Sequence, residues 1–171
     1  TDPEQIMVTI GAQHAIALLA RTLLARGDRA LVETPSYPHA MEALRDHGAR
    51  LVGVSVSSLR GWDEAGLEQA MRRTSPTLGY LMPDFHNPTG QTMPDALRER
   101  TVDLAAAAGT TLVIDETISD LAIDEVPAHP PFAVHGSAGS MPVLIGSVGK
   151  TVWGGMRVGW IRAERPLIQR L

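Results

Sequence analysis

Short apolar segments of strand length alternate with segments of helical periodicity along almost the whole chain. This alternation constrains the fold more than any other feature, because strands that alternate with helices form a mainly parallel sheet with helices on both faces. We therefore predict an α/β fold, a three-layer α/β/α sandwich around a mainly parallel sheet. The predicted strands cover residues 30–33, 51–56, 77–82, 112–114, 143–145 and 158–161, and the predicted helices cover residues 13–26, 40–46, 63–72 and 94–108.

Individual residues mark where several of these elements begin and end. Asp63 is a candidate N-cap, Pro94 fits the first turn of its helix, and Gly109 follows the last helical residue. Residues 34–38 contain two prolines, so we expect them to be irregular. The Pro- and Gly-rich residues 127–139 are also expected to be irregular.

Length and charge limit the number of domains and the classes of partner. With 171 residues, 44% of them hydrophobic, the chain is long enough for one sizeable core, and we expect residues 1–171 to form one globular domain. The net charge is -4, and no run of arginines exceeds the pair Arg72-Arg73. The sequence therefore offers no basic face for a nucleic acid.

Cysteine and histidine usage points away from disulfides and metals. The chain has no cysteine, which excludes a disulfide framework and a thiolate zinc site and favours the cytoplasm. The histidines show no metal-ligand spacing, and His86 is expected to be a solvated loop residue, with a place in a binding site as the alternative. No apolar stretch approaches the roughly 20 residues that cross a bilayer, so no membrane partner is expected.

Lysine is almost absent: all but one of the 15 basic residues are arginine, and the exception is Lys150. A genome rich in G and C explains a general scarcity of lysine, but it leaves the exception unexplained. Arginine keeps its proton in proteins, whereas a lysine ammonium can be converted to the free amine that attacks a carbonyl. Lys150 is therefore a candidate nucleophile, and a surface charge left by chance is the alternative.

Three polar residues, Asn87, Asp115 and Lys150, each stand at or just after the end of a predicted strand. Parallel α/β sheets bind their ligands outside the carboxyl ends of the strands. We expect these residues to gather there with Tyr37, which lies in a loop between two prolines. As alternatives, Asn87 forms a turn before its proline, Asp115 caps a helix or pairs with a base, and Tyr37 covers the core.

A phosphate site is expected beside this cluster. The helix that begins near Gln13 follows Gly11 and Ala12, and its first backbone N–H groups and the positive end of its dipole attract an anion. Arg157 can add a bidentate clamp on the same anion. Pyridoxal 5′-phosphate (PLP) presents an anion, a carbonyl and a ring nitrogen, and it needs a lysine and an acidic partner for that nitrogen.

Four motifs follow one another along the chain: N-P-T-G at residues 87–90, D-E at 115–116, S-V-G-K at 147–150 and W-G-G-M-R-V-G-W at 153–160. In order and approximate spacing they resemble the PLP-dependent aminotransferases of classes I and II. The resemblance runs over essentially the whole chain. It implies that residues 1–171 form the large, PLP-binding domain of fold type I.

The resemblance implies catalytic roles for two residues. Lys150 would form the internal aldimine with PLP and move the proton between the substrate α carbon and the cofactor, and Asp115 would pair with the pyridinium nitrogen. Asn87 would hydrogen-bond the phenolic oxygen of the cofactor, and Tyr37 would stack on its ring. The residues that would hold the phosphate are Ala12, Gln13, Ser147 and Arg157.

The same resemblance implies transamination between an amino acid or amine and a 2-oxo acid, in a homodimer. Family members usually carry a tyrosine three positions after the aspartate, and this chain has Ile118 there, so one donor to the phenolic oxygen is missing. The small domain and an N-terminal segment of the family would lie outside residues 1–171. We therefore expect the chain to be a fragment.

Residues 2–6, 11–13 and 83–87 are more similar to the MocR-type regulators, GntR-family proteins in which a DNA-binding domain precedes an aminotransferase-like domain. This similarity implies a second function, a cofactor- or effector-sensing domain with little or no transaminase activity. Any DNA binding would then belong to an upstream domain. An α/β domain without a cofactor is the third alternative.

Overall fold

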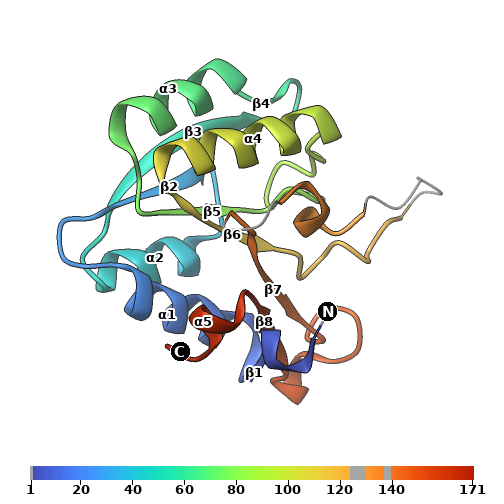
Figure 1. Ribbon diagram of the computed structural model, residues 1–171. Coiled ribbons are helices and arrows are strands. Elements are labelled where there is room, and N and C mark those ends of the chain that lie inside the picture. Colours follow the sequence, from blue (N-terminus) through green and yellow to red (C-terminus); the bar gives the residue numbers. More distant parts are fainter. Residues whose placement is uncertain (1, 124–129, 137–139) are drawn as a thin grey trace.

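The computed structural model describes residues 2–123, 130–136 and 140–171 and arranges them around one sheet. The strands are β1 (Ile6–Thr9), β2 (Arg29–Thr34), β3 (Arg50–Ser57), β4 (Gly61–Trp62), β5 (Leu78–Leu81), β6 (Thr111–Asp115), β7 (Val143–Ser147) and β8 (Gly159–Arg162). They lie side by side in the order β1-β8-β7-β6-β5-β2-β3-β4 (Figure 1).

The central strands of this sheet are parallel. β2 pairs in parallel with β3 and β5, and β6 pairs in parallel with β5 and β7. Antiparallel pairs occur only toward the two edges of the described sheet, where β8 pairs with β1 and β7 and β4 pairs with β3. The predicted mainly parallel sheet is therefore confirmed.

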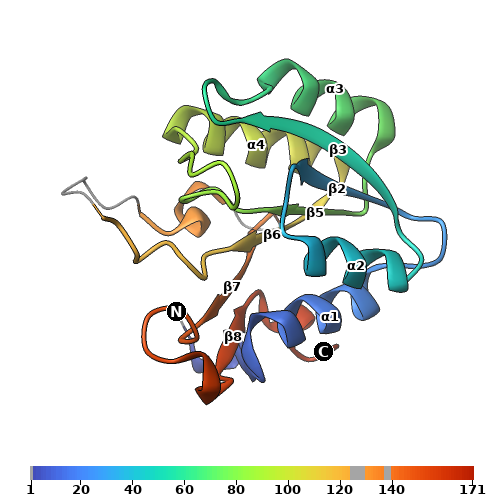
Figure 2. The same cartoon turned by 180° about the vertical axis from the view of Figure 1, so that it is seen from behind.

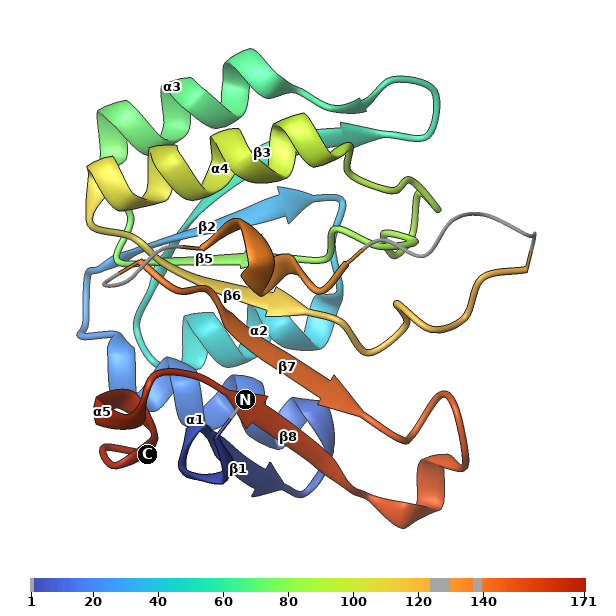
Figure 3. The same ribbon diagram turned by 45° about the vertical axis from the view of Figure 1, so that its right-hand side comes forward.

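Helices cover both faces of the sheet (Figures 2 and 3). The helices are α1 (Gly11–Leu23), α2 (Pro38–Asp46) and α5 (Arg165–Ile168) on one face and α3 (Glu64–Thr74) and α4 (Asp95–Ala108) on the other, with short 3-10 helices at Pro3–Gln5, Phe132–His135 and Gly154–Met156. One buried apolar cluster includes Leu19 and Leu44 beneath α1 and α2, and another includes Leu67 and Leu97 beneath α3 and α4. These two cores on opposite faces confirm the three-layer sandwich.

The predicted element boundaries are confirmed within a few residues, but two assignments of prolines are wrong. Residues 34–38 are not irregular throughout, because Pro38 is the first residue of α2, a position where the missing N–H costs nothing. Pro94 is the N-cap of α4 and precedes its first turn. Asp63 is confirmed as an N-cap, since its side chain accepts a backbone N–H at 3.0 Å, and Gly109 ends α4 with a left-handed φ of 68°.

The periodicity of the sequence predicts none of β1, β4 and α5. Each has four residues or fewer, which is too short to show a helical or strand period. Within the stretch predicted to be irregular, Phe132–His135 instead forms a 3-10 helix. Residues 127–129 and 137–139 of that stretch lie outside the described residues.

The parallel strands place several loops at one edge of the sheet. Figure 3 shows the segments that follow β5, β6 and β7 on the same side of the molecule, where the carboxyl ends of these strands lie. None of the helices in the described ranges combines the length and the apolar character needed to cross a membrane.

Candidate functional site

A cavity of about 290 Å³ opens at the carboxyl edge of the sheet. Its walls come from the first turn of α1, the loops after β2, β5 and β6, and the segment after β7. This one cavity brings together all eight residues that the sequence predicts for the site, which are Ala12, Gln13, Tyr37, Asn87, Asp115, Ser147, Lys150 and Arg157. Lining residues that were not predicted to bind the cofactor include Met82, Thr117 and Ile118.

The first turn of α1 meets β8 through two glycines. Gly11 begins the helix with φ +76°, a conformation that costs glycine little. A Cβ atom at Gly159 would lie 2.6 Å from the carbonyl carbon of Gly11, so only a glycine allows β8 to pack this closely. This close contact brings the first turn of α1 beside the segment that carries Arg157.

The first backbone N–H groups of α1 have no partner within the helix, so they can bind an anion. Ala12 and Gln13 belong to this turn, as predicted. The side-chain amide of Gln13 donates to the backbone oxygen of His39 at 3.0 Å. The side chain of Gln13 therefore joins α1 to α2, and its backbone N–H is the group that could bind an anion.

The segment after β7 folds back over its own start. The Ser147 hydroxyl donates to the backbone oxygen of Val158 at 3.0 Å and accepts from the backbone N–H of Gly149 at 3.0 Å. Lys150 and Arg157 lie exposed at the cavity, and Arg157 has a left-handed φ of 52°. Two cationic side chains thus line the same cavity as the Asp115 carboxylate.

Asp115 is the last residue of β6, which confirms its predicted place at a strand end, and it is only 5% exposed. Its Oδ1 accepts hydrogen bonds from both the backbone N–H, at 2.9 Å, and the hydroxyl of Thr117. Its Oδ2 accepts from the Tyr80 hydroxyl at 2.6 Å. The carboxylate is therefore fixed in one orientation by three donors.

Tyr80 acts as a donor in this contact. Burial, followed by the nearby Asp115 carboxylate, raises the pKa of the Tyr80 hydroxyl well above its ordinary value. The phenol consequently keeps its proton across the physiological pH range and presents it to Asp115.

Asn87 lies exposed in a loop that is anchored by a fully buried acid on β2. Glu33 accepts from the indole N–H of Trp62 at 2.8 Å and from the backbone N–H of Met82 at 2.9 Å. His86 Nε2 lies 3.2 Å from Glu33 Oε2, and its Nδ1 lies 2.8 Å from the Thr89 hydroxyl. The prediction of a solvated His86 is wrong, because its ring is fully buried, beside Glu33 and edge-on to the Trp62 ring.

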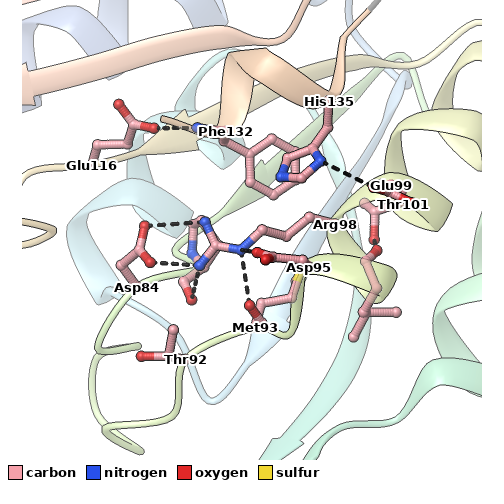
Figure 4. Close-up of polar contacts among 12 residues, drawn as sticks. Asp84, Thr92, Met93, Asp95, Arg98, Glu99, Thr101, Glu116, Phe132 and His135 are labelled. Carbon is pink, nitrogen blue, oxygen red and sulfur yellow. Dashed lines mark hydrogen bonds and ion pairs between the residues drawn. The ribbon is translucent and has the colours of Figure 1, made fainter. Parts of the chain in front are cut away.

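The other end of the same loop is held by Arg98 of α4 (Figure 4). This guanidinium is fully buried and donates to Asp84 Oδ1 at 2.5 Å and to the backbone oxygen of Met93 at 2.8 Å. Its charge also lies over the Phe132 ring, 5.7 Å from the ring centre. The loop that carries Asn87 is thus tied to both β2 and α4.

Sequence reasoning missed the residues that support the site. Tyr80 and Glu33 lie in apolar strand segments, and nothing in their spacing distinguishes them from core positions. The contact of Thr117 with Asp115 could have been predicted, because an aspartate commonly accepts the backbone N–H two residues later. The position three residues after Asp115 is Ile118, which lines the cavity with an apolar side chain.

The chain is similar to known proteins over almost its whole length. The model of the family "Aminotransferase class I and II" matches residues 1–171. The 2-aminoadipate transaminase of Thermus thermophilus is 32% identical over 170 residues, which are 99% of this chain and 43% of that protein. The HTH-type transcriptional regulator YisV of Bacillus subtilis is 32% identical over 173 residues, 99% of this chain and 34% of the regulator.

A solved structure agrees with both the fold and the sequence similarity. LysN, the α-aminoadipate aminotransferase of Thermus thermophilus complexed with N-(5′-phosphopyridoxyl)-L-leucine, superposes with a TM-score of 0.91 and 31% identity, covering 99% of this chain and 44% of LysN. The chain spans less than half the length of these relatives, which include both transaminases and transcriptional regulators. The chain has the fold type I architecture, and it belongs to the class I and II aminotransferase family.

Proposed function

We propose that residues 1–171 form the large, PLP-binding domain of an aminotransferase-like protein, with Lys150 as the residue that binds the cofactor covalently. The observation that carries this proposal is that the only lysine of the chain lies in the same cavity as the buried Asp115 and the first turn of α1. The proposed reaction moves an amino group between an amino acid or amine and a 2-oxo acid.

The groups that line the cavity fit PLP in charge and in hydrogen bonding. The first-turn N–H groups of α1 and the Arg157 guanidinium are donors for a phosphate. The Ser147 hydroxyl can rotate from its backbone acceptor to a phosphate oxygen. Asp115 offers an acceptor to a protonated ring nitrogen, and Lys150 offers an amine to an aldehyde. The space, about 290 Å³, lies near the lower end of the range for small-molecule sites.

Each residue has a separate task in this arrangement. When bound, PLP supplies an aldehyde that captures amines and a ring that accepts electrons from the substrate α carbon. Lys150 holds the cofactor and carries a proton to and from that carbon. Asp115 keeps the ring nitrogen protonated, Asn87 donates to the ring oxygen, and Tyr37 covers the ring face.

Borohydride trapping tests the covalent assignment. The protein is incubated with PLP, reduced with borohydride and digested, and the labelled peptide is identified by mass spectrometry. We expect the label on Lys150 and none after Lys150→Ala or Lys150→Arg, since arginine keeps the charge but cannot attack the aldehyde. Labelling that is equally strong after Lys150→Ala would show that another amine binds the cofactor.

The similarity to the regulator YisV favours a second candidate function, an effector-sensing domain of a MocR-type regulator. Ile118 supports this alternative, because an apolar side chain cannot donate to the ring oxygen. Single-turnover reaction of the PLP-loaded protein with a panel of amino acids separates the two candidates. Conversion of the cofactor to its amine form favours the enzyme, whereas binding of an amino acid without conversion favours the sensor.

Two further parts of the proposal concern partners. We propose a homodimer, which analytical ultracentrifugation of the PLP-loaded protein tests directly; a monomer at all concentrations would contradict it. We also propose that residues 1–171 do not bind DNA, since the net charge of -4 repels phosphates. Salt-sensitive, sequence-selective DNA binding by these residues would refute the charge argument.

A further inference from the structure

The cavity-facing carboxylate of Asp115 is supported from behind by Tyr80, a side chain that is only 1% exposed. The two residues come from adjacent parallel strands, in which Tyr80 of β5 pairs with Val113 of β6. Paired residues lie on the same face of a sheet, and Asp115 is two residues farther along that face. The Tyr80 hydroxyl therefore reaches diagonally toward the strand end and donates to Asp115 Oδ2 at 2.6 Å.

The hydrogen bonds that Asp115 accepts leave one side of its carboxylate open to a further donor. A carboxylate has about four acceptor sites on its two oxygens. Oδ1 accepts twice from Thr117, and Oδ2 accepts once from Tyr80. Further donors must approach from the cavity, because the remaining surroundings of Asp115 are buried. The charged side chains that line this cavity with Asp115 are Lys150 and Arg157.

We propose that Tyr80 is a positioning residue that aims the carboxylate of Asp115 at the ring nitrogen of the cofactor. This inference rests on the PLP-binding function proposed above and adds to it a residue outside the cavity. Without the phenol hydroxyl, Asp115 Oδ2 would face an apolar ring and lose the hydrogen bond that fixes its direction. A carboxylate that is no longer held toward the cavity forms a weaker hydrogen bond with a protonated ring nitrogen.

Ligand pairs that differ at one ring atom test this role by binding alone. Dissociation constants are measured by calorimetry on cofactor-free protein for pyridoxamine 5′-phosphate and for its 1-deaza analogue, in which a C–H replaces the ring nitrogen. Neither ligand has an aldehyde, so neither depends on a covalent bond to Lys150. We expect the unaltered protein to prefer the ligand with the nitrogen, and Tyr80→Phe to lower that preference about tenfold.

Three variants control for a loss of stability. Thr117→Val removes another donor to Asp115 and should lower the same preference, whereas Thr117→Ser keeps the hydroxyl and should restore it. Thr110→Val removes a buried hydroxyl at the opposite end of the sheet, where it donates to the backbone oxygen of Pro76 at 2.6 Å, and should leave the preference unchanged.

The outcomes separate this inference from the proposed function. If Tyr80→Phe weakens both ligands equally, or leaves the preference intact, Tyr80 does not position Asp115 and the inference is wrong. If the unaltered protein binds neither ligand, or shows no preference between them, the proposed pairing of Asp115 with the ring nitrogen fails first. That second failure is visible before any Tyr80 variant is made.

Discussion

Replacement of Arg98 by methionine tests how the loop that carries Asn87 is held. The substitution keeps an unbranched apolar stem of similar reach and removes the guanidinium. Arg98 is fully buried, and the side chain of Asp84 is only 9% exposed, so the variant leaves a buried carboxylate without its cation (Figure 4). The backbone oxygen of Met93 loses its donor as well.

The expected loss of stability follows from these contacts. Removing one partner of a buried ion pair typically costs about 3 to 5 kcal/mol, because the remaining charge stays desolvated. Removing both charges costs much less, since no uncompensated charge then remains. We therefore expect Arg98→Met to lower the free energy of unfolding by about 3 to 5 kcal/mol and the double variant with Asp84→Asn to recover more than half of that loss.

Urea unfolding followed by circular dichroism measures both values without added cofactor. Arg100→Met is the matched control, because Arg100 is half-exposed and pairs with Glu68 at the surface, where solvent screens an ion pair and it contributes little to stability. A double variant that is as unstable as Arg98→Met would show that the loss comes from packing against Phe132. The ion-pair argument would then be refuted.

Three other residues give separate predictions. Burial raises the pKa of Glu116, so the folded protein binds this proton more tightly than the unfolded chain does. Stability should therefore fall as the pH rises from the ordinary glutamate pKa through the raised one. Urea unfolding at several pH values should show a flatter dependence for Glu116→Gln. Glu33→Ala leaves two buried N–H donors without an acceptor and should cost about 2 to 6 kcal/mol, whereas Glu33→Gln, measured by the same unfolding assay, should cost less. Asp115→Ala should slow single-turnover conversion of bound PLP far more than it weakens PLP binding; equal losses in the two assays would remove Asp115 from the chemistry.

The sequence was sufficient to predict the sheet and most of the cavity residues for a simple physical reason, whereas Ser147 came from the family resemblance. Parallel strands with apolar interiors fix where their carboxyl ends lie, so polar residues that follow those strands must meet at one edge. The unusual residues there are chemically distinct: a lone lysine, a carboxylate at a strand end and a helix start preceded by glycine. Their convergence in one cavity follows from topology.

The edges of the sheet were not predictable in the same way. β1 has four residues and pairs with β8, which is distant in the sequence. β4 has two residues and pairs with β3 across a tight turn. Among the described strands, β1 pairs with β8 alone, and Arg162 of β8 pairs in register with Ile6 from the opposite end of the chain. Pairing of this kind depends on the assembled sheet and leaves little local pattern.

The polar residues that support the site escaped prediction because they occupy core positions. Tyr80 and Glu33 lie on neighbouring strands, β5 and β2, and point to opposite faces, as their packing with the two apolar clusters and with Trp62 indicates. Tyr80 fixes Asp115 on the face of α1 and α2, while Glu33 fixes the backbone of Met82, where the loop to Asn87 begins. β5 therefore connects the two supports, and changes in its register would displace the acid and the amide of the cavity together.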